Sequence, residues 1–201
     1  MSSKRWLQEH FTDLYVKKAN EEGFVSRAAY KLIEINEKDH LFQNGMTIVD
    51  LGAAPGGWCQ VAMSKIGGSG RVVAVDILPI ELVSGIEFIQ GDFTEQACLD
   101  QLLMRLTDGV DVVLSDMAPN ISGNKSVDQP AAVYLVELAL DLAIKILKPK
   151  GKFVAKIFQG SGVDAVVDSM KKHFKIVKYR KPKSSRSRSA EIYLVGLEFK
   201  G

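Results

Sequence analysis

The chain has 201 residues, with 26 Lys and Arg against 24 Asp and Glu, and therefore a formal net charge of +2. This length fits one domain with a sizeable core, and 46% hydrophobic with 25% charged residues is a globular rather than a disordered composition. Two cysteines, Cys59 and Cys98, are too few for a disulfide framework and lack zinc-type spacing, so we expect free thiols and no metal site.

Two features predict a cytoplasmic location without membrane contact. Residues 1–18 are charged and lack the apolar segment of a signal peptide. The most apolar long run, residues 131–147, contains three charged side chains, which excludes a membrane-spanning helix.

The small net charge conceals an uneven distribution. Residues 171–190 contain nine Lys and Arg and no acid, which leaves 17 basic against 24 acidic residues elsewhere, a net charge of −7. Such a run is often only a solvated face, but it is also typical of a nucleic-acid contact.

Two helices are expected in the first 45 residues. In the first, Trp6, Leu7, Phe11, Leu14 and Tyr15 recur at helical spacing. The second is expected to be capped by Ser26 and to end before Asn44.

From residue 47 onward, short β-branched runs alternate with amphipathic helices. The strands are expected at residues 47–51, 71–76, 86–90, 110–115, 152–157, 175–179 and 192–199, and the helices at 58–66, 96–106, 131–147 and 163–173. This alternation predicts an α/β fold: a doubly wound, mostly parallel seven-stranded sheet with helices on both faces. The last two strands are joined without a helix, which favours an antiparallel pair at the sheet edge.

Ligands of such sheets bind beyond the carboxyl ends of the strands, where four acids are expected: Asp50, Asp76, Asp92 and Asp116. A glycine-rich turn follows Asp50, but it lacks the G-x-G-x-x-G spacing of a dinucleotide site. Asp76 can accept from ribose hydroxyls and Asp92 from an adenine amino group, although either acid alone could be a helix cap. Together the acids favour a cationic nucleoside, S-adenosylmethionine, over an anionic dinucleotide.

Two lysines and one glutamate are further candidates. Lys156 interrupts the apolar run 153–158, and lysine is almost never fully buried without a partner. Lys31 lies on the second helix, where an ordinary surface lysine is an equally good interpretation. Glu191 opens the last strand, directly after a basic, serine-rich loop.

With these motifs in this order, the chain resembles the FtsJ-like ribose 2′-O-methyltransferases over nearly its whole length, and most of all their bacterial heat-shock subgroup. The motifs are Ser26-Arg27-Ala28 to Lys31-Leu32, residues 50–58, Asp76-Ile77-Leu78-Pro79, Gln90-Gly91-Asp92-Phe93, residues 115–120, Lys156 to Gly160, and Arg180-Lys181-Pro182 to Glu191. The resemblance implies one Rossmann-like class I S-adenosylmethionine-dependent methyltransferase domain over residues 1–201. Residues 46–201 would form its core, and the helices of residues 1–45 would add to an RNA surface.

The resemblance also implies roles for individual residues. The catalytic tetrad would be Lys31, Asp116, Lys156 and Glu191. The cofactor contacts would be Gly56, Trp58, Asp76, Asp92 and Asp116. RNA would be bound by residues 171–188, above all Lys181, Lys183, Arg186 and Arg188, with Lys4, Arg5 and Arg27.

The implied substrate is a uridine 2′-hydroxyl in large-subunit ribosomal RNA, in the A loop of assembled subunits, modified by a monomer with no obligatory protein partner. Lys156 would act either as a neutral general base or as a cation that orients the hydroxyl. Three alternatives stay open: an NAD-dependent oxidoreductase, a non-catalytic RNA-binding assembly factor, and a 2′-O-methyltransferase acting on transfer RNA or a messenger cap.

Overall fold

A computed structural model describes residues 13–80, 84–186 and 188–201 of the chain. It contains a seven-stranded sheet in the order β3-β2-β1-β4-β5-β7-β6. The strands are β1 (Thr47–Leu51), β2 (Arg71–Asp76), β3 (Ile86–Gln90), β4 (Val110–Ser115), β5 (Leu147–Phe158), β6 (Phe174–Arg180) and β7 (Glu191–Phe199). The helices are α2 (Leu14–Glu22), α3 (Ala29–Asp39), α4 (Gly57–Ile66), α5 (Gln96–Arg105), α6 (Lys125–Ile146) and α7 (Val163–His173).

The sheet confirms the predicted α/β architecture and the antiparallel pairing of the last two strands. The pairs from β3 through β5 are all parallel. Strand β7 runs antiparallel to both of its neighbours and lies between β5 and β6, which leaves β6 at the edge.

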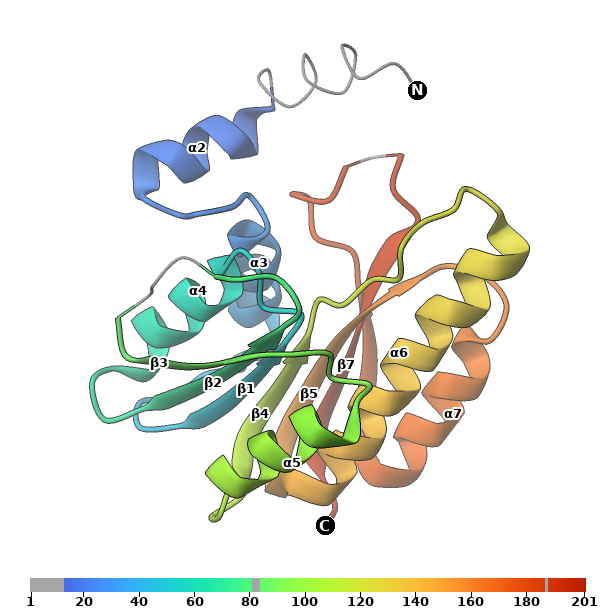
Figure 1. The fold of residues 1–201 in the computed structure, drawn as a ribbon. Helices are drawn as coiled ribbons and strands as arrows, with labels where there is room; N and C mark the ends of the chain where they lie inside the picture. Colours follow the sequence, from blue (N-terminus) through green and yellow to red (C-terminus); the bar gives the residue numbers. More distant parts are fainter. Residues whose placement is uncertain (1–12, 81–83, 187) are drawn as a thin grey trace.

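Helices cover both faces of the sheet (Figure 1). Helices α5, α6 and α7 pack on one face, with core residues that include Leu102, Leu140 and Val166. Helices α3 and α4 pack on the other face, where Leu32, Trp58 and further apolar side chains form a second cluster. No helix in the described part of the chain is long and apolar enough to cross a membrane.

Several element boundaries differ from the predictions. Helix α6 begins six residues earlier than expected, at Lys125, and includes Pro130, although proline interrupts helical hydrogen bonding. Strand β5 begins five residues earlier, directly after α6, with an irregular register beside β4. Ser26 does not cap α3, whose N-cap is Ala28. Most of the first predicted helix lies outside the described residues.

Candidate active site

The glycine-rich turn after β1 has a backbone that few residues other than glycine could adopt. Gly52 has φ +76°, and a Cβ at this position would lie 2.8 Å from Cγ of Met117. Gly56, at φ 109°, is the N-cap of α4. The turn therefore brings bare backbone close to the strand ends, which is what a bound ligand at this edge requires.

Asp76 and Asp92 are held next to this turn by backbone hydrogen bonds. The Asp76 carboxylate accepts from the N–H groups of Ala54 and Leu78, both at 2.8 Å. The Asp92 carboxylate accepts from the backbone and hydroxyl of Thr94 at 2.8 and 2.7 Å, and these bonds lower its pKa. Gly91, which precedes Asp92, donates to the Asp76 carbonyl at 2.9 Å, so the two acids follow neighbouring strands at one edge.

Two buried oxygens near the turn lack partners among the described residues: Oγ of Ser26 and Oδ1 of Asp50. The other oxygen of Asp50 accepts from the Cys59 thiol at 3.1 Å. Burial raises the pKa of Asp50 to about 7, with further increases from the charges of Asp116 and Asp76. Unsatisfied polar atoms, bare glycine backbone and a row of acids fit a cationic nucleoside such as S-adenosylmethionine.

Trp58 lines a small pocket together with the glycine-rich turn and Asp116, but its indole nitrogen is bonded within the protein. Its side chain is 3% exposed, and its indole donates to the Ala28 carbonyl at 2.9 Å. The ring packs 5.7 Å from that of Tyr193. Trp58 thus forms part of the wall that joins α4 to β7, and its indole nitrogen is already committed to the protein backbone.

The four residues of the predicted tetrad form two ion pairs. Lys156 Nζ lies 3.2 Å from Oδ1 of Asp116 and also donates to the Asp116 carbonyl. Lys31 Nζ lies 2.6 Å from Oε1 of Glu191. All four side chains are between 11% and 18% exposed, so water can reach the cluster but screens it only in part.

The two ion pairs are electrostatically coupled. Burial acts to raise the pKa of Glu191, but the charge and hydrogen bond of Lys31, the Ser185 hydroxyl and the charge of Lys156 together hold it below its ordinary value. Tyr193, which the sequence reasoning missed, donates to Oδ1 of Asp116 at 3.0 Å. Its pKa is raised by burial and by the charges of Asp116 and Glu191.

The sheet topology explains how distant residues meet. Asp116 follows the end of β4, and Lys156 lies near the end of β5, opposite Tyr193 of β7. Glu191 is the first residue of β7, but because β7 is antiparallel its beginning lies at the edge where β4 and β5 end. Lys31 comes from helix α3, which packs with α4 on the face of the sheet that contains Tyr193.

The predicted RNA-binding residues are only partly gathered at this edge. A cavity of about 520 Å³ brings Arg27, Arg186 and Arg188 together with Lys31 and Glu191. Arg27 is paired with Asp13 and donates to the Ser184 carbonyl, and its pKa is lowered by burial and by the charge of Arg186. Positive charge therefore lies directly beside the tetrad.

Other basic residues brace the structure or lie elsewhere. Lys181 Nζ donates to the carbonyls of Ser189 and Glu191, both at 2.6 Å, across the loop between β6 and β7. Lys183 has an exposed side chain outside the cavity beside the tetrad, and Lys4 and Arg5 lie outside the described residues. Strand β6 begins opposite the end of β7. Three lysines near its beginning therefore lie at the opposite end of the strands from Glu191: Lys171, Lys172 and Lys175.

Two acids on α3 hold this basic segment in place, and neither was predicted. The Glu34 carboxylate accepts from the backbone N–H groups of Lys183 and Ser184, at 2.6 and 2.8 Å. The fully buried Asp39 carboxylate binds Arg180 at 2.6 and 2.7 Å and Lys178 at 3.1 Å. These contacts fix the loop that leads into Glu191.

A mostly parallel sheet of this order, with a row of acids at the carboxyl ends of its strands beside a Lys-Asp-Lys-Glu cluster, is typical of a Rossmann-like group-transfer enzyme. Residues 24–199 match the FtsJ-like methyltransferase model, and the chain belongs to this family. The predicted family and methyltransferase activity are thereby confirmed, and the NAD-dependent oxidoreductase alternative is wrong.

Individual relatives agree with this assignment. "Ribosomal RNA large subunit methyltransferase E" of Cellvibrio japonicus (strain Ueda107) is 57% identical over all 201 residues, which cover 95% of the relative. A crystal structure described as a ribosomal RNA methyltransferase from Plasmodium falciparum has a TM-score of 0.77 at 30% identity, over 89% of this chain and 100% of that one. A structure described as an rRNA methylase from Clostridium thermocellum, at 18% identity and a TM-score of 0.56 over 84% and 97% of the chains, supports the fold alone.

Proposed function

We propose that this methyltransferase transfers the methyl group of S-adenosylmethionine to a ribose 2′-hydroxyl of large-subunit ribosomal RNA. The observation that carries the proposal is the cluster of two coupled ion pairs, Lys156–Asp116 and Lys31–Glu191, between the glycine-rich turn and a basic cavity. The name of the relative from Cellvibrio japonicus favours ribosomal RNA over transfer RNA or a messenger cap.

The finer proposal concerns the substrate and the working unit. The acceptor is a uridine of the A loop in assembled subunits, and the enzyme is a cytoplasmic monomer that needs no protein partner. Residues 1–201 act as one domain, to which residues 1–45 contribute RNA contacts. Arg27, just before α3 and beside the tetrad, supports the RNA contacts of this segment. The burial of Leu32 in the core supports a single domain.

The cofactor would be held by the acids and bare backbone of the glycine-rich edge. Asp76 accepts from the ribose hydroxyls, Asp92 accepts from the adenine amino group, and Asp116 faces the positively charged end. Gly56 allows close approach of the backbone at the start of α4. When bound, S-adenosylmethionine supplies a methyl group already activated by its sulfonium.

The protein's own residues position the acceptor oxygen and stabilise it as it loses its proton. Alignment of reacting groups contributes up to roughly 7–11 kcal/mol in favourable systems. Lys156, paired with Asp116, donates a hydrogen bond to the 2′-oxygen and stabilises its developing negative charge, while the hydroxyl proton passes to the solvent water that reaches the cluster. Lys31 and Glu191 fix the charge balance around Lys156, and Tyr193 fixes the Asp116 carboxylate through its hydroxyl.

The proposed activity predicts methyl transfer to purified large subunits. With labelled S-adenosylmethionine and subunits from a strain lacking the gene, we expect one 2′-O-methyl group per subunit, and mapping should place it on a uridine of the A loop. Asp76→Asn serves as a control that weakens cofactor binding. Transfer to transfer RNA or capped RNA in place of subunits would contradict the substrate assignment, and binding of subunits without transfer would support an assembly factor.

Charge reversal at Arg186 and Arg188 is expected to weaken RNA binding and its salt dependence. Each lost phosphate contact lowers the slope of log affinity against log salt by about 0.7–0.9, so the double variant should lower it by roughly 1.4–1.8. Titrations at several salt concentrations measure this. Lys172→Glu, in the same basic stretch but at the far edge of the sheet, is the matched control. An unchanged slope would show that the two arginines contact solvent and not RNA phosphates.

A further inference from the structure

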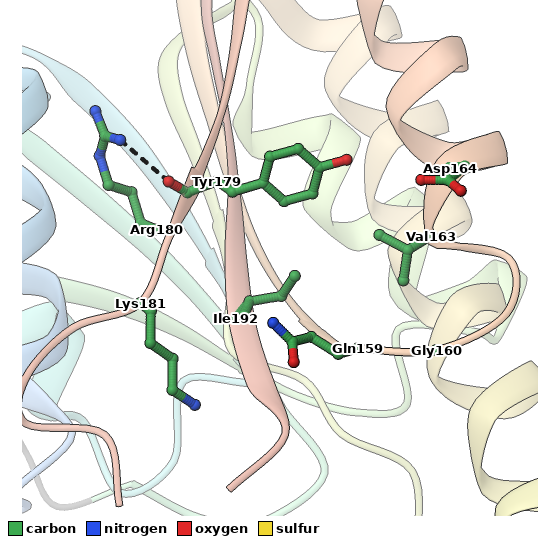
Figure 2. A pocket seen from close by; sticks show the side chains of 8 residues that line it. All are labelled: Gln159, Gly160, Val163, Asp164, Tyr179, Arg180, Lys181 and Ile192. Atoms are coloured by element: carbon green, nitrogen blue, oxygen red, sulfur yellow. Dashed lines mark hydrogen bonds between the residues drawn. The ribbon is translucent and has the colours of Figure 1, made fainter. Parts of the chain in front are cut away.

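A cavity of about 400 Å³ lies at the carboxyl end of β5, beside the start of α7. Figure 2 shows its side chains, with the ring of Tyr179 directed toward Val163 and Asp164 of α7. Tyr179 pairs with Leu194, whose side chain belongs to the core on the α6 and α7 side of the sheet. The cavity thus lies on the opposite face of the sheet from Tyr193 and the tetrad.

The groups in this cavity suit a planar, uncharged ring with hydrogen-bonding edges. The Tyr179 side chain is 49% exposed, a large aromatic surface open to solvent. Gln159 is exposed at the cavity wall, and its carboxamide can both donate and accept. Buried Ile192 and Val163 supply an apolar floor. This combination of a stacking surface and an amide is how proteins bind single-stranded nucleobases.

Charge decides which part of a nucleotide the cavity accepts. The Asp164 carboxylate lines the cavity and disfavours a phosphate inside it. Lys181 also lines the cavity, but its ammonium is already bound to the carbonyls of Ser189 and Glu191. In Figure 2 the guanidinium of Arg180 points away from the Tyr179 ring. It is bound by the buried carboxylate of Asp39. The cavity therefore favours a base over a phosphate.

A second cavity connects this one with the strand ends beside the tetrad. This second cavity, of about 510 Å³, shares Gln159 and Gly160 with the first and extends to Phe158 and Ala190. Phe158 pairs with Glu191 of the tetrad, and the Gln159 N–H donates to the Ala190 carbonyl at 2.9 Å. A nucleic-acid strand can therefore pass from the tetrad over Ala190 to Tyr179.

We propose that this cavity binds an unpaired nucleobase of the substrate RNA, next to the methylated nucleotide, stacked on Tyr179 and hydrogen-bonded by Gln159. The proposal rests on the proposed RNA substrate and adds a subsite to it. Tyr179 and Gln159 determine which neighbouring sequence is bound well, whereas the tetrad performs the transfer.

The first test compares tyrosine variants in the full-length enzyme. Stacking of one base on an aromatic side chain corresponds to about 5- to 150-fold in affinity, so Tyr179→Ala should raise the KM for RNA by a factor in this range. The kcat at saturating RNA and the KM for S-adenosylmethionine should change less than twofold. Tyr179→Phe should retain wild-type KM because its ring remains. Tyr134→Ala is the matched control: Tyr134 is 55% exposed on α6 and outside the cavity.

The second test changes the RNA rather than the protein, by removing one nucleobase at a time. Synthetic stem-loop RNAs that the wild type methylates are prepared with one abasic site at each unpaired neighbour of the acceptor. One abasic site should weaken binding to the wild type and leave binding to Tyr179→Ala unchanged. Equal KM values for Tyr179→Ala and the wild type, or equal loss in both proteins at every abasic position, would overturn the subsite. Absence of methyl transfer by the wild type to purified large subunits would instead overturn the proposed function.

Discussion

Lys156→Arg should lower turnover by about 10²–10³-fold at saturating RNA and S-adenosylmethionine, the range typical of a lost hydrogen-bond donor to a developing oxyanion. Arginine keeps the positive charge, so a loss of this size isolates the geometry of the ammonium group. Lys156 is 11% exposed and binds both the carboxylate and the carbonyl of Asp116. A planar guanidinium has a different donor geometry and cannot make the same contacts.

Single-turnover kinetics with pre-bound RNA measure this effect without the contribution of product release. Cofactor affinity, measured by calorimetry, should stay within about twofold of wild type. Lys152→Arg is the matched control on the same strand, because Lys152 donates to the carbonyls of His40 and Leu41 and takes no part in the tetrad. An arginine variant that turns over at near wild-type rate would remove Lys156 from the catalytic step.

Asp50→Asn should abolish a large pH dependence of stability. Burial raises the pKa of Asp50 to about 7 in the folded chain, above an ordinary value of about 4. The folded state therefore binds a proton that the unfolded state releases between pH 4 and 7, so the free energy of unfolding falls as the pH rises through this window and levels off above it. A difference of three pKa units corresponds to about 4 kcal/mol.

Urea unfolding of the cofactor-free protein at pH 4, 5.5, 7 and 8 measures this dependence. The stability of the asparagine variant relative to wild type should increase from pH 4 to 7 and stay constant to pH 8. Asn can still accept from the Cys59 thiol, so packing is preserved. Asp100→Asn, an exposed carboxylate on α5, is the control. A constant difference between wild type and Asp50→Asn at all four pH values would show that Asp50 stays ionised.

The sequence predicted those features whose signals are local. Alternating hydrophobic runs located β1 to β4 and α7 at the observed residues, and the rule for parallel sheets predicted that Asp50, Asp76 and Asp116 gather at one edge. The four members of the tetrad came from the family resemblance, and the structure arranges them in two ion pairs that were not predicted.

Long-range packing left no comparable signal. Glu34 contacts backbone groups 149 and 150 residues away, and Asp39 binds cations 139 and 141 residues away. The count of charges could not show which basic residues of the stretch lie beside the tetrad and which lie at the opposite end of β6. That separation depends on how β6 pairs with β7. Trp58 lies in the motif that predicts cofactor contact, yet its indole is buried in the packing between α4 and β7.

The position of β7 links catalytic competence to the completion of folding. Strand β7 lies between β5 and β6 and pairs with both. Without it, both strands would expose unpaired backbone groups, which promote aggregation. The same strand carries Glu191 and Tyr193. A chain interrupted before Glu191 would therefore lose half of one ion pair together with the strand that joins β6 to the rest of the sheet. An incompletely folded chain cannot acquire the tetrad, so it cannot bind RNA productively before its last strand is in place.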